Sequence, residues 1–97
     1  MQKQSANWWK QAERDILSAE HSLEAADFYV AAFLSQQAVE KALKALYIQK
    51  FRELKKTHDL VFLANKLELS ENHKTICKRL DPVYLQTRYP DVSGQLP

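Results

Sequence analysis

Apolar residues recur at helical spacing along nearly the whole chain. The first helix is expected from Ser5 or Asn7 to about Ala26, with either of those first two residues as its cap. Its apolar positions alternate between spacings of three and four residues, a narrow seam suited to antiparallel packing. The members of this seam are Trp9, Ala12, Ile16, Ala19, Leu23 and Ala26.

The second helix is expected from about Tyr29 to Phe51, with Asp27 as its cap. Alanine is frequent on its apolar side, and such small side chains let a neighbouring helix approach closely. The core stripe is expected to consist of Phe33, Leu34, Ala38, Ala42, Ala45 and Leu46.

A short third helix is expected from about Asp59 to Leu67, capped by Thr57 or Asp59, and a fourth from about Glu71 to Gln86. Pro82 lies inside the fourth pattern, so we expect a kink or a break near Leu80 or Asp81. The inward-facing residues are expected to be Leu60, Leu63, Ala64, Leu67, Ile76, Leu80, Val83 and Tyr84. Regular structure is expected to end at Pro90, Gly94 and Pro97.

These patterns predict an all-α fold, an up-and-down antiparallel four-helix bundle formed by one domain, residues 1–97. The chain has a single glycine, so it lacks the positive-φ positions that β-hairpins use. Cys77 is the only cysteine; it cannot form an internal disulfide, and no Cys/His pattern suggests zinc. We therefore expect a cytoplasmic protein with no metal, cofactor or membrane span.

Charge is unevenly distributed although the formal net charge is only +2. Residues 11–27 are mainly acidic, whereas residues 41–58 contain six lysines and arginines against one glutamate. This asymmetry indicates either complementary charges between neighbouring helices or a site for an anion or an acidic partner.

A row of polar residues accompanies the core stripe of the second helix. Gln37, Lys41 and Lys44 stand at i, i+4 and i+7, so they share one helix face. Such a row either pairs internally, as Glu40 with Lys44 at i, i+4, or contacts a dimer partner, or lines a ligand cleft.

Two later segments carry further candidate chemistry. Lys56-Thr57-His58-Asp59-Leu60 places a histidine before a helix, where it either bonds a backbone group or carboxylate, or contacts a nucleotide or partner. Thr87-Arg88-Tyr89-Pro90-Asp91 is a turn by composition. Its arginine either ties the turn to a helix carboxylate or contacts phosphate.

Together with residues 35–46, these two segments, in this order, resemble the HEPN family, especially members encoded beside minimal nucleotidyltransferases. The resemblance extends from about Trp9 to Asp91. It implies a helical binding module that forms a homodimer and partners a nucleotidyltransferase in a toxin–antitoxin-type pair, with a nucleotide as a candidate ligand. The ligand-binding residues implied by matching positions are Gln37, Lys41, Lys44, His58 and Arg88.

The alternative functions are a metal-independent endoribonuclease toxin and a ligand-free oligomerisation domain. HEPN ribonucleases use an arginine followed, after four to six residues, by a histidine. After Arg88, the matching positions hold Ser93, Gly94 and Gln95, none of which is an imidazole base. The same spacing occurs in Arg14–His21 and Arg52–His58, but neither pair lies at the family position. We therefore predict no catalytic residue and leave RNA open as a ligand.

The resemblance also implies one more long helix after the Arg88–Asp91 turn, whereas this sequence stops at Pro97. It is either a piece of a longer chain or a shortened family member. A bundle without that helix would expose an apolar groove. Because self-association is a common way to cover such a groove, it too predicts a homodimer.

Overall fold

The computed structural model describes residues 1–88, which form four α-helices and no strand. The helices are α1 (Lys3–Glu24), α2 (Phe28–Phe51), α3 (Leu60–Lys66) and α4 (Glu71–Arg88). This confirms the all-α prediction. The expected turn at 89–91 and the expected ends at Pro90, Gly94 and Pro97 lie outside the described residues.

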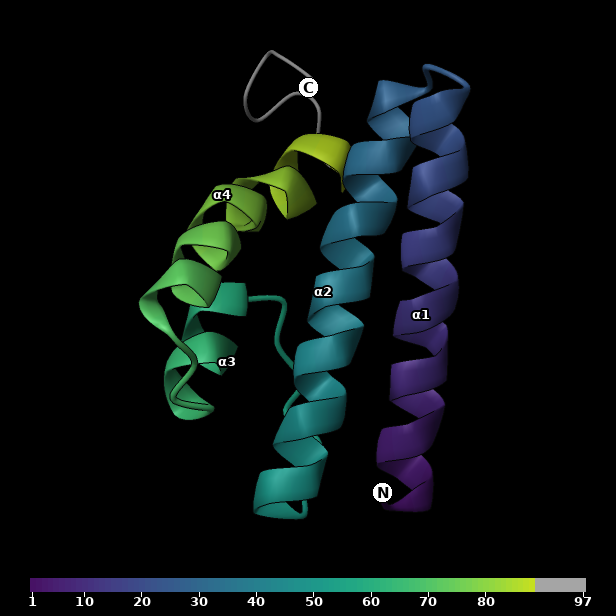
Figure 1. Cartoon of the computed structure of the whole chain (residues 1–97). Helices are drawn as coiled ribbons and strands as arrows, with labels where there is room; N and C mark the ends of the chain where they lie inside the picture. The colour runs from purple at the N-terminus through teal and green to yellow at the C-terminus, as the bar shows by residue number, and fades with distance from the viewer. Residues whose placement is uncertain (89–97) are drawn as a thin grey trace.

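α2 is the central element of the bundle (Figure 1). α1 runs antiparallel beside it and packs against no other described helix, while α3 and α4 lie on the other side of α2. Because α2 has neighbours on two sides, its apolar residues are not confined to one stripe. Ala38 and Ala45 are buried as predicted, and Leu43, Tyr47 and Ile48 are buried as well.

The core between α2, α3 and α4 follows the predicted pattern of the third helix. Leu60, Leu63 and Ala64 are completely buried there. They pack with Leu43 and Tyr47 of α2, and Cys77 of α4 closes the cluster. The short α3 is thus held by apolar side chains on three of its seven residues.

Two of the predicted helix caps are confirmed and one is wrong. The Asp27 carboxylate accepts the N–H of Val30, and the Asp59 carboxylate accepts the N–H of Phe62. α1, however, begins at Lys3, before the predicted cap residues Ser5 and Asn7. Because the backbone carbonyl of Gln2 accepts the N–H of Ala6, the first turn forms without a side-chain cap.

The α1 seam, predicted to serve antiparallel packing, is only half buried. Ala12 and Ala19 are buried against α2, whereas Trp9, Ile16 and Leu23 are 38%, 44% and 58% exposed. The alanines face α2 and bring the two helices close together. The larger side chains stand beside this contact, and no other described helix covers them. Ala26 is exposed and lies in the turn after α1, where its φ is 60°.

α4 continues through Pro82 to Arg88, so of the predicted kink or break near Leu80 or Asp81 the break is excluded, and the helix ends two residues after the expected end at about Gln86. Figure 1 shows the helix arching toward the start of α2. Ile76 is 49% exposed, contrary to the prediction that it faces the core. None of the four helices combines the length and apolar character needed to cross a membrane.

Candidate ligand-binding cluster and apolar groove

Glu40 is the centre of a polar cluster inside the bundle. It is 5% exposed, and its carboxylate accepts hydrogen bonds from Gln36 Nε2 at 3.1 Å and Lys44 Nζ at 3.0 Å. The same carboxylate lies 3.0 Å from His58 Nδ1, which reaches it from the loop before α3. Gln36 and Lys44 are themselves buried. The cluster therefore joins α2 to the α2–α3 loop through charged and polar contacts with little access to water.

These contacts keep Glu40 ionised. Burial by itself raises the pKa of the Glu40 carboxyl, but the hydrogen bonds from His58, Lys44 and Gln36 and the charge of Lys44 outweigh it. The net result is a pKa below its usual range. An ionised carboxylate accepts hydrogen bonds and donates none, so Nδ1 of His58 must carry the hydrogen that lies between the two groups.

The face of the His58 imidazole ring is also in contact with a neighbouring side chain. Its ring stacks on Tyr84 of α4 with centroids 4.1 Å apart and an interplanar angle of 15°. The Arg88 guanidinium lies 4.8 Å from the same Tyr84 ring and 5.6 Å from the ring of Phe33. The far end of α4 is anchored nearby, because the Tyr29 hydroxyl donates to the backbone carbonyl of Thr87. Tyr84 thus connects the histidine to the arginine.

Gln37, Lys44, His58 and Arg88, four of the five predicted ligand-binding residues, belong to one connected set of contacts. Gln37 joins it at the start, where its Nε2 donates to Gln36 Oε1 at 2.7 Å. The contacts then pass through Glu40, His58 and Tyr84 to Arg88. Whether these residues bind a ligand stays a prediction.

Lys41 is the exception, because it points toward α1. Its Nζ donates to the Asp15 carboxylate at 2.7 Å. Lys44 lies between Glu40 and the ring of Trp8, 5.4 Å from the ring centroid. Both lysines therefore pair inside the chain, and the predicted Glu40–Lys44 pair is confirmed.

Asp81 fixes the segment that carries His58. Its two carboxylate oxygens accept the backbone N–H groups of Leu60 and Val61, at 2.7 and 3.1 Å, and so cap the start of α3 from α4. Burial raises the pKa of the Asp81 carboxyl above its ordinary value even though the two N–H groups favour its charged form. Sequence reasoning missed both this cap and the role of Tyr84, because each partner comes from a helix distant in sequence.

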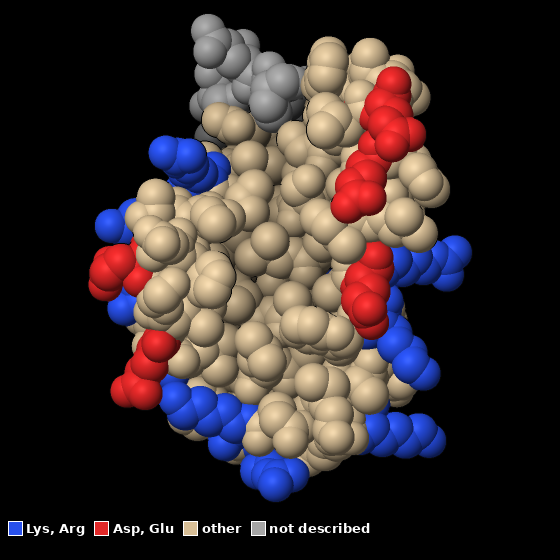
Figure 2. Space-filling view, in the orientation of Figure 1, with Lys and Arg blue, Asp and Glu red and all other residues tan. Residues whose placement is uncertain are grey.

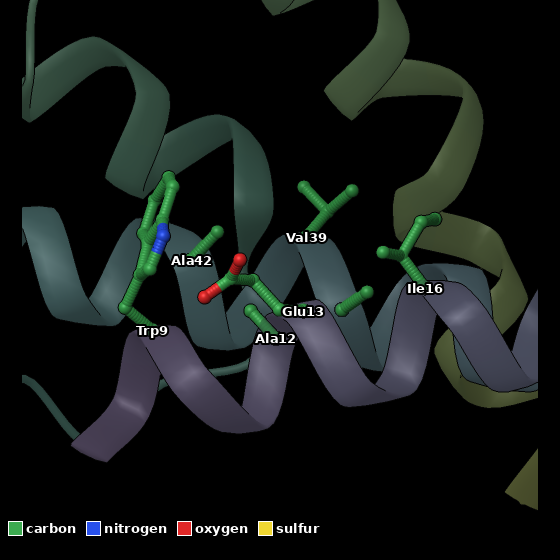
Figure 3. Close-up of a pocket in the computed structure, with 7 residues that line it drawn as sticks. Trp9, Ala12, Glu13, Ile16, Val39 and Ala42 are labelled. Carbon is green, nitrogen blue, oxygen red and sulfur yellow. The ribbon is translucent and has the colours of Figure 1, made fainter. Parts of the chain in front are cut away.

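A second feature is an apolar groove between α1 and α4 along α2. Figure 2 shows a largely uncharged surface on this face, with acidic side chains following α1 along one margin. One hollow of about 230 Å³ lies between α1 and α2. Figure 3 shows Trp9, Ala12 and Ile16 of α1 approaching Val39 and Ala42 of α2 around it, with Glu13 at its edge. A neighbouring hollow of about 300 Å³ extends to Ile76 and Cys77 of α4.

The sequence model of the HEPN domain matches residues 5–95, almost the entire chain. The chain belongs to the HEPN domain family. No curated protein and no solved structure gives a significant match. The family assignment therefore rests on the sequence match, and the four-helix fold agrees with it.

Neither internal Arg–His pair of this HEPN chain forms a recognisable catalytic site. Arg14 and His21 are both exposed on α1, about 10 Å apart along the helix. Arg52 ends α2 in the left-handed conformation, with φ 62°. Within residues 1–88, no hydrogen bond or ion pair joins its side chain to His58. The positions 93–95 that follow Arg88 lie outside the described residues.

The described part of this HEPN chain offers no group of three or more His, Cys, Asp or Glu side chains that could hold a metal ion. Cys77 is a buried thiol, and burial, with the charge of Asp81, raises its pKa. A raised pKa lowers the fraction of thiolate, which is the reactive form. The polar cluster around Glu40 and the apolar groove are therefore the two candidate functional features.

Proposed function

We propose that this HEPN chain is an interaction module that forms a homodimer and pairs with a minimal nucleotidyltransferase in a toxin–antitoxin-type system. The observation that supports it best is the groove, which a third hollow continues between α1 and the start of α2. The large apolar side chains that line these hollows, Trp9, Ile16, Leu23, Phe28 and Ile76, are each more than a third exposed. A contiguous apolar surface of this kind is typical of a protein–protein contact.

The α1 seam makes a second copy a suitable occupant. Trp9, Ile16 and Leu23 follow one another at intervals of seven residues, the repeat used by packed helix pairs. In a two-fold dimer the same surface serves both partners, so one apolar ridge per chain is enough. A stable interface of this type buries at least roughly 1,000 Å² in total.

Sedimentation equilibrium at micromolar concentration tests the homodimer. The wild-type chain should sediment at twice 11.3 kDa. Ile16→Glu, which places a charge in the groove, should shift it to the monomer. Leu17→Glu is the matched control, because Leu17 is 53% exposed and does not line the groove hollows. A wild-type monomer, or two variants that behave alike, would contradict the proposal.

The nucleotidyltransferase pairing is tested separately, by co-expression with the neighbouring reading frame and affinity purification. Support for the pairing comes from the resemblance to HEPN proteins that are encoded beside such enzymes. A nucleotidyltransferase beside this gene that co-purifies with the tagged chain is the expected result. Unrelated neighbouring genes, or a neighbouring nucleotidyltransferase that does not co-purify, would count against the pairing.

Nucleotide binding is a second candidate function, and the connected contacts from Glu40 to Arg88 favour it. They bring an imidazole, a phenol ring and a guanidinium together, groups that suit a phosphate and a base. Titration with ATP or GTP should show weak binding that Arg88→Ala reduces about tenfold, the loss expected for one charge-assisted hydrogen bond of about 1.5 kcal/mol. Lys10→Ala, on the exposed side of α1, is the control. Equal affinities in all three proteins would point away from this cluster.

A further inference from the structure

The four basic side chains at or near the predicted nucleotide site are not equivalent. Lys41 and Lys44 are each bonded to a carboxylate, at 2.7 and 3.0 Å, and Lys44 is 7% exposed. A phosphate that used either lysine would approach an ammonium group whose charge that carboxylate already neutralises, and would meet the repulsion of the carboxylate. The side chain of His58 is 50% exposed, and Arg88 is also exposed. The accessible donors are thus the histidine and the arginine.

The orientation of His58 is determined by its buried partner. Nδ1 faces the ionised carboxylate of Glu40, so the hydrogen of the neutral ring lies on Nδ1 and Nε2 carries a lone pair. Stacking on Tyr84 fixes the plane of the ring. With Nδ1 engaged and the side chain half exposed, Nε2 is the ring nitrogen left for a ligand. Metal-binding and catalytic histidines are commonly oriented in this way by a carboxylate on the other ring nitrogen.

The histidine and the arginine are close enough to share one polyanion. The His58 ring lies 4.1 Å and the Arg88 Cζ 4.8 Å from the same Tyr84 centroid, so they are separated by at most about 9 Å, the sum of 4.1 and 4.8 Å. A di- or triphosphate chain is long enough to reach two groups at this separation. The ionisable groups in contact with the imidazole are Glu40 of α2 and Tyr84 of α4. Lys44 lies on the other side of the Glu40 carboxylate, Arg88 contacts Tyr84, and Asp59 is adjacent in the chain.

We infer that Glu40 is a positioning residue that holds His58 with Nε2 outward, and that His58 Nε2 and Arg88 form a proton-gated site for the phosphates of a nucleotide. The ligand part of this inference rests on the proposed nucleotide binding. The neutral ring presents a lone pair that repels phosphate oxygens, whereas the protonated ring donates Nε2–H to them. Phosphate affinity should therefore be higher when the ring carries both protons than when it carries one.

The first test is the tautomer of His58, which requires no ligand. Nitrogen-15 NMR at pH 8 should show the hydrogen of the neutral ring on Nδ1. In Glu40→Gln/Lys44→Met, which neutralises the buried pair together, the Nε2–H form should increase. A wild-type ring with its hydrogen on Nε2, or an unchanged ring in a folded double variant, would overturn the positioning role of Glu40.

The second test separates this site from the proposed function. Titration with sulfate, whose charge is constant between pH 5 and 8, should show about tenfold tighter binding at pH 5.5 than at pH 8, and ATP should compete with it. His58→Gln should remove the pH dependence, while Lys10→Ala, on the exposed side of α1, should keep it. A sulfate affinity that does not change with pH, or that is the same in His58→Gln as in the wild type, overturns the gated site but does not contradict nucleotide binding. No binding of sulfate or ATP at any pH refutes both the nucleotide proposal and the gated site, but not the tautomer.

Discussion

Glu40 is a carboxylate with almost no access to water, and it keeps its charge because three donors surround it. Removing one donor would leave the buried carboxylate charge of Glu40 with too few hydrogen-bond partners. This is far more destabilising than replacing both members of a buried ion pair with apolar residues. This residue therefore links the stability of the bundle to the candidate site. It also makes part of that stability dependent on pH.

The pH dependence follows from the lowered pKa of Glu40. A carboxyl whose pKa is lower in the folded state contributes stability above its unfolded pKa, about 4.3, and this contribution is lost as the pH falls through the folded value. The free energy of unfolding, measured by urea denaturation, should therefore fall between roughly pH 5 and pH 3. The raised pKa of Asp81 acts in the opposite direction, so a comparison between variants is needed.

Glu40→Gln/Lys44→Met is the appropriate comparison, because it removes both charges and leaves Asp81 in place. Its unfolding free energy should depend less steeply on pH than that of the wild type over the same acidic range. Parallel curves for the two proteins would show that Glu40 does not carry the acid sensitivity.

The Asp81 side chain of α4 connects this helix to the start of α3. It accepts the first two backbone N–H groups of α3, so Asp81→Ala leaves two partly buried donors without a partner. We expect a loss of about 1–3 kcal/mol in the free energy of unfolding for each N–H donor that does not find a water molecule as a new hydrogen-bond partner. Chemical denaturation measures it. Asp59→Ala, which removes the Phe62 bond and the contact of Asp59 with Asp81 but keeps both Asp81 cap bonds, is the control. An equal or smaller loss in Asp81→Ala would argue against this cap.

α3 is the element whose existence depends most on its neighbours. With seven residues it is too short to be stable alone, since isolated helices of fewer than about 12 residues are marginal in water. Its intrinsic helix propensity is therefore insufficient, and the helix is stabilised by its apolar contacts with α2 and α4 and by its two aspartate caps. Because His58 directly precedes this helix, the position of the candidate site depends on the same contacts.

Leu63 offers a direct measure of this dependence. It is completely buried in the α2–α3–α4 core, so Leu63→Ala should lower the free energy of unfolding by about 2–5 kcal/mol. Leu85→Ala serves as the control, because Leu85 is 48% exposed. A loss below about 1 kcal/mol at Leu63 would mean that α3 can detach without opening the core.

At the scale of the whole molecule, the ribonuclease alternative depends on which groups meet. Arg88 contacts Tyr84 and Phe33, and the positions at the family spacing after it hold no histidine. The histidine that does lie near Arg88 is His58, reached through Tyr84 from a different part of the chain. Removing a general base from its place typically reduces a rate by about 10² to 10⁴.

We therefore expect the purified chain to leave single-stranded RNA intact in the presence of a chelator. The assay includes Arg88→Ala and His58→Ala as controls. Chelator-resistant cleavage lost in Arg88→Ala would restore the toxin hypothesis. Cleavage lost in His58→Ala would assign the base to that histidine.

Much of the fold could be predicted from local patterns. The 3.6-residue period of apolar side chains indicates four helices, and the caps Asp27 and Asp59 follow from side chains that bond the backbone three residues on. The Glu40–Lys44 pair is equally local, because i and i+4 are neighbours on any helix. All these features depend on atoms within one or two turns of each other, and so the sequence by itself determined them.

Contacts between distant segments were decided only by the tertiary structure. Lys41 meets Asp15 across 26 positions, and His58 meets both Glu40 and Tyr84. The half-exposed seam of α1 has the same origin, since periodicity shows that Trp9 and Ile16 share a face but not what covers it. A side chain's surroundings depend on how the helices pack, and many packings satisfy one pattern of apolar residues. The sequence therefore determined which residues could carry a site, and the packing decided which of them meet.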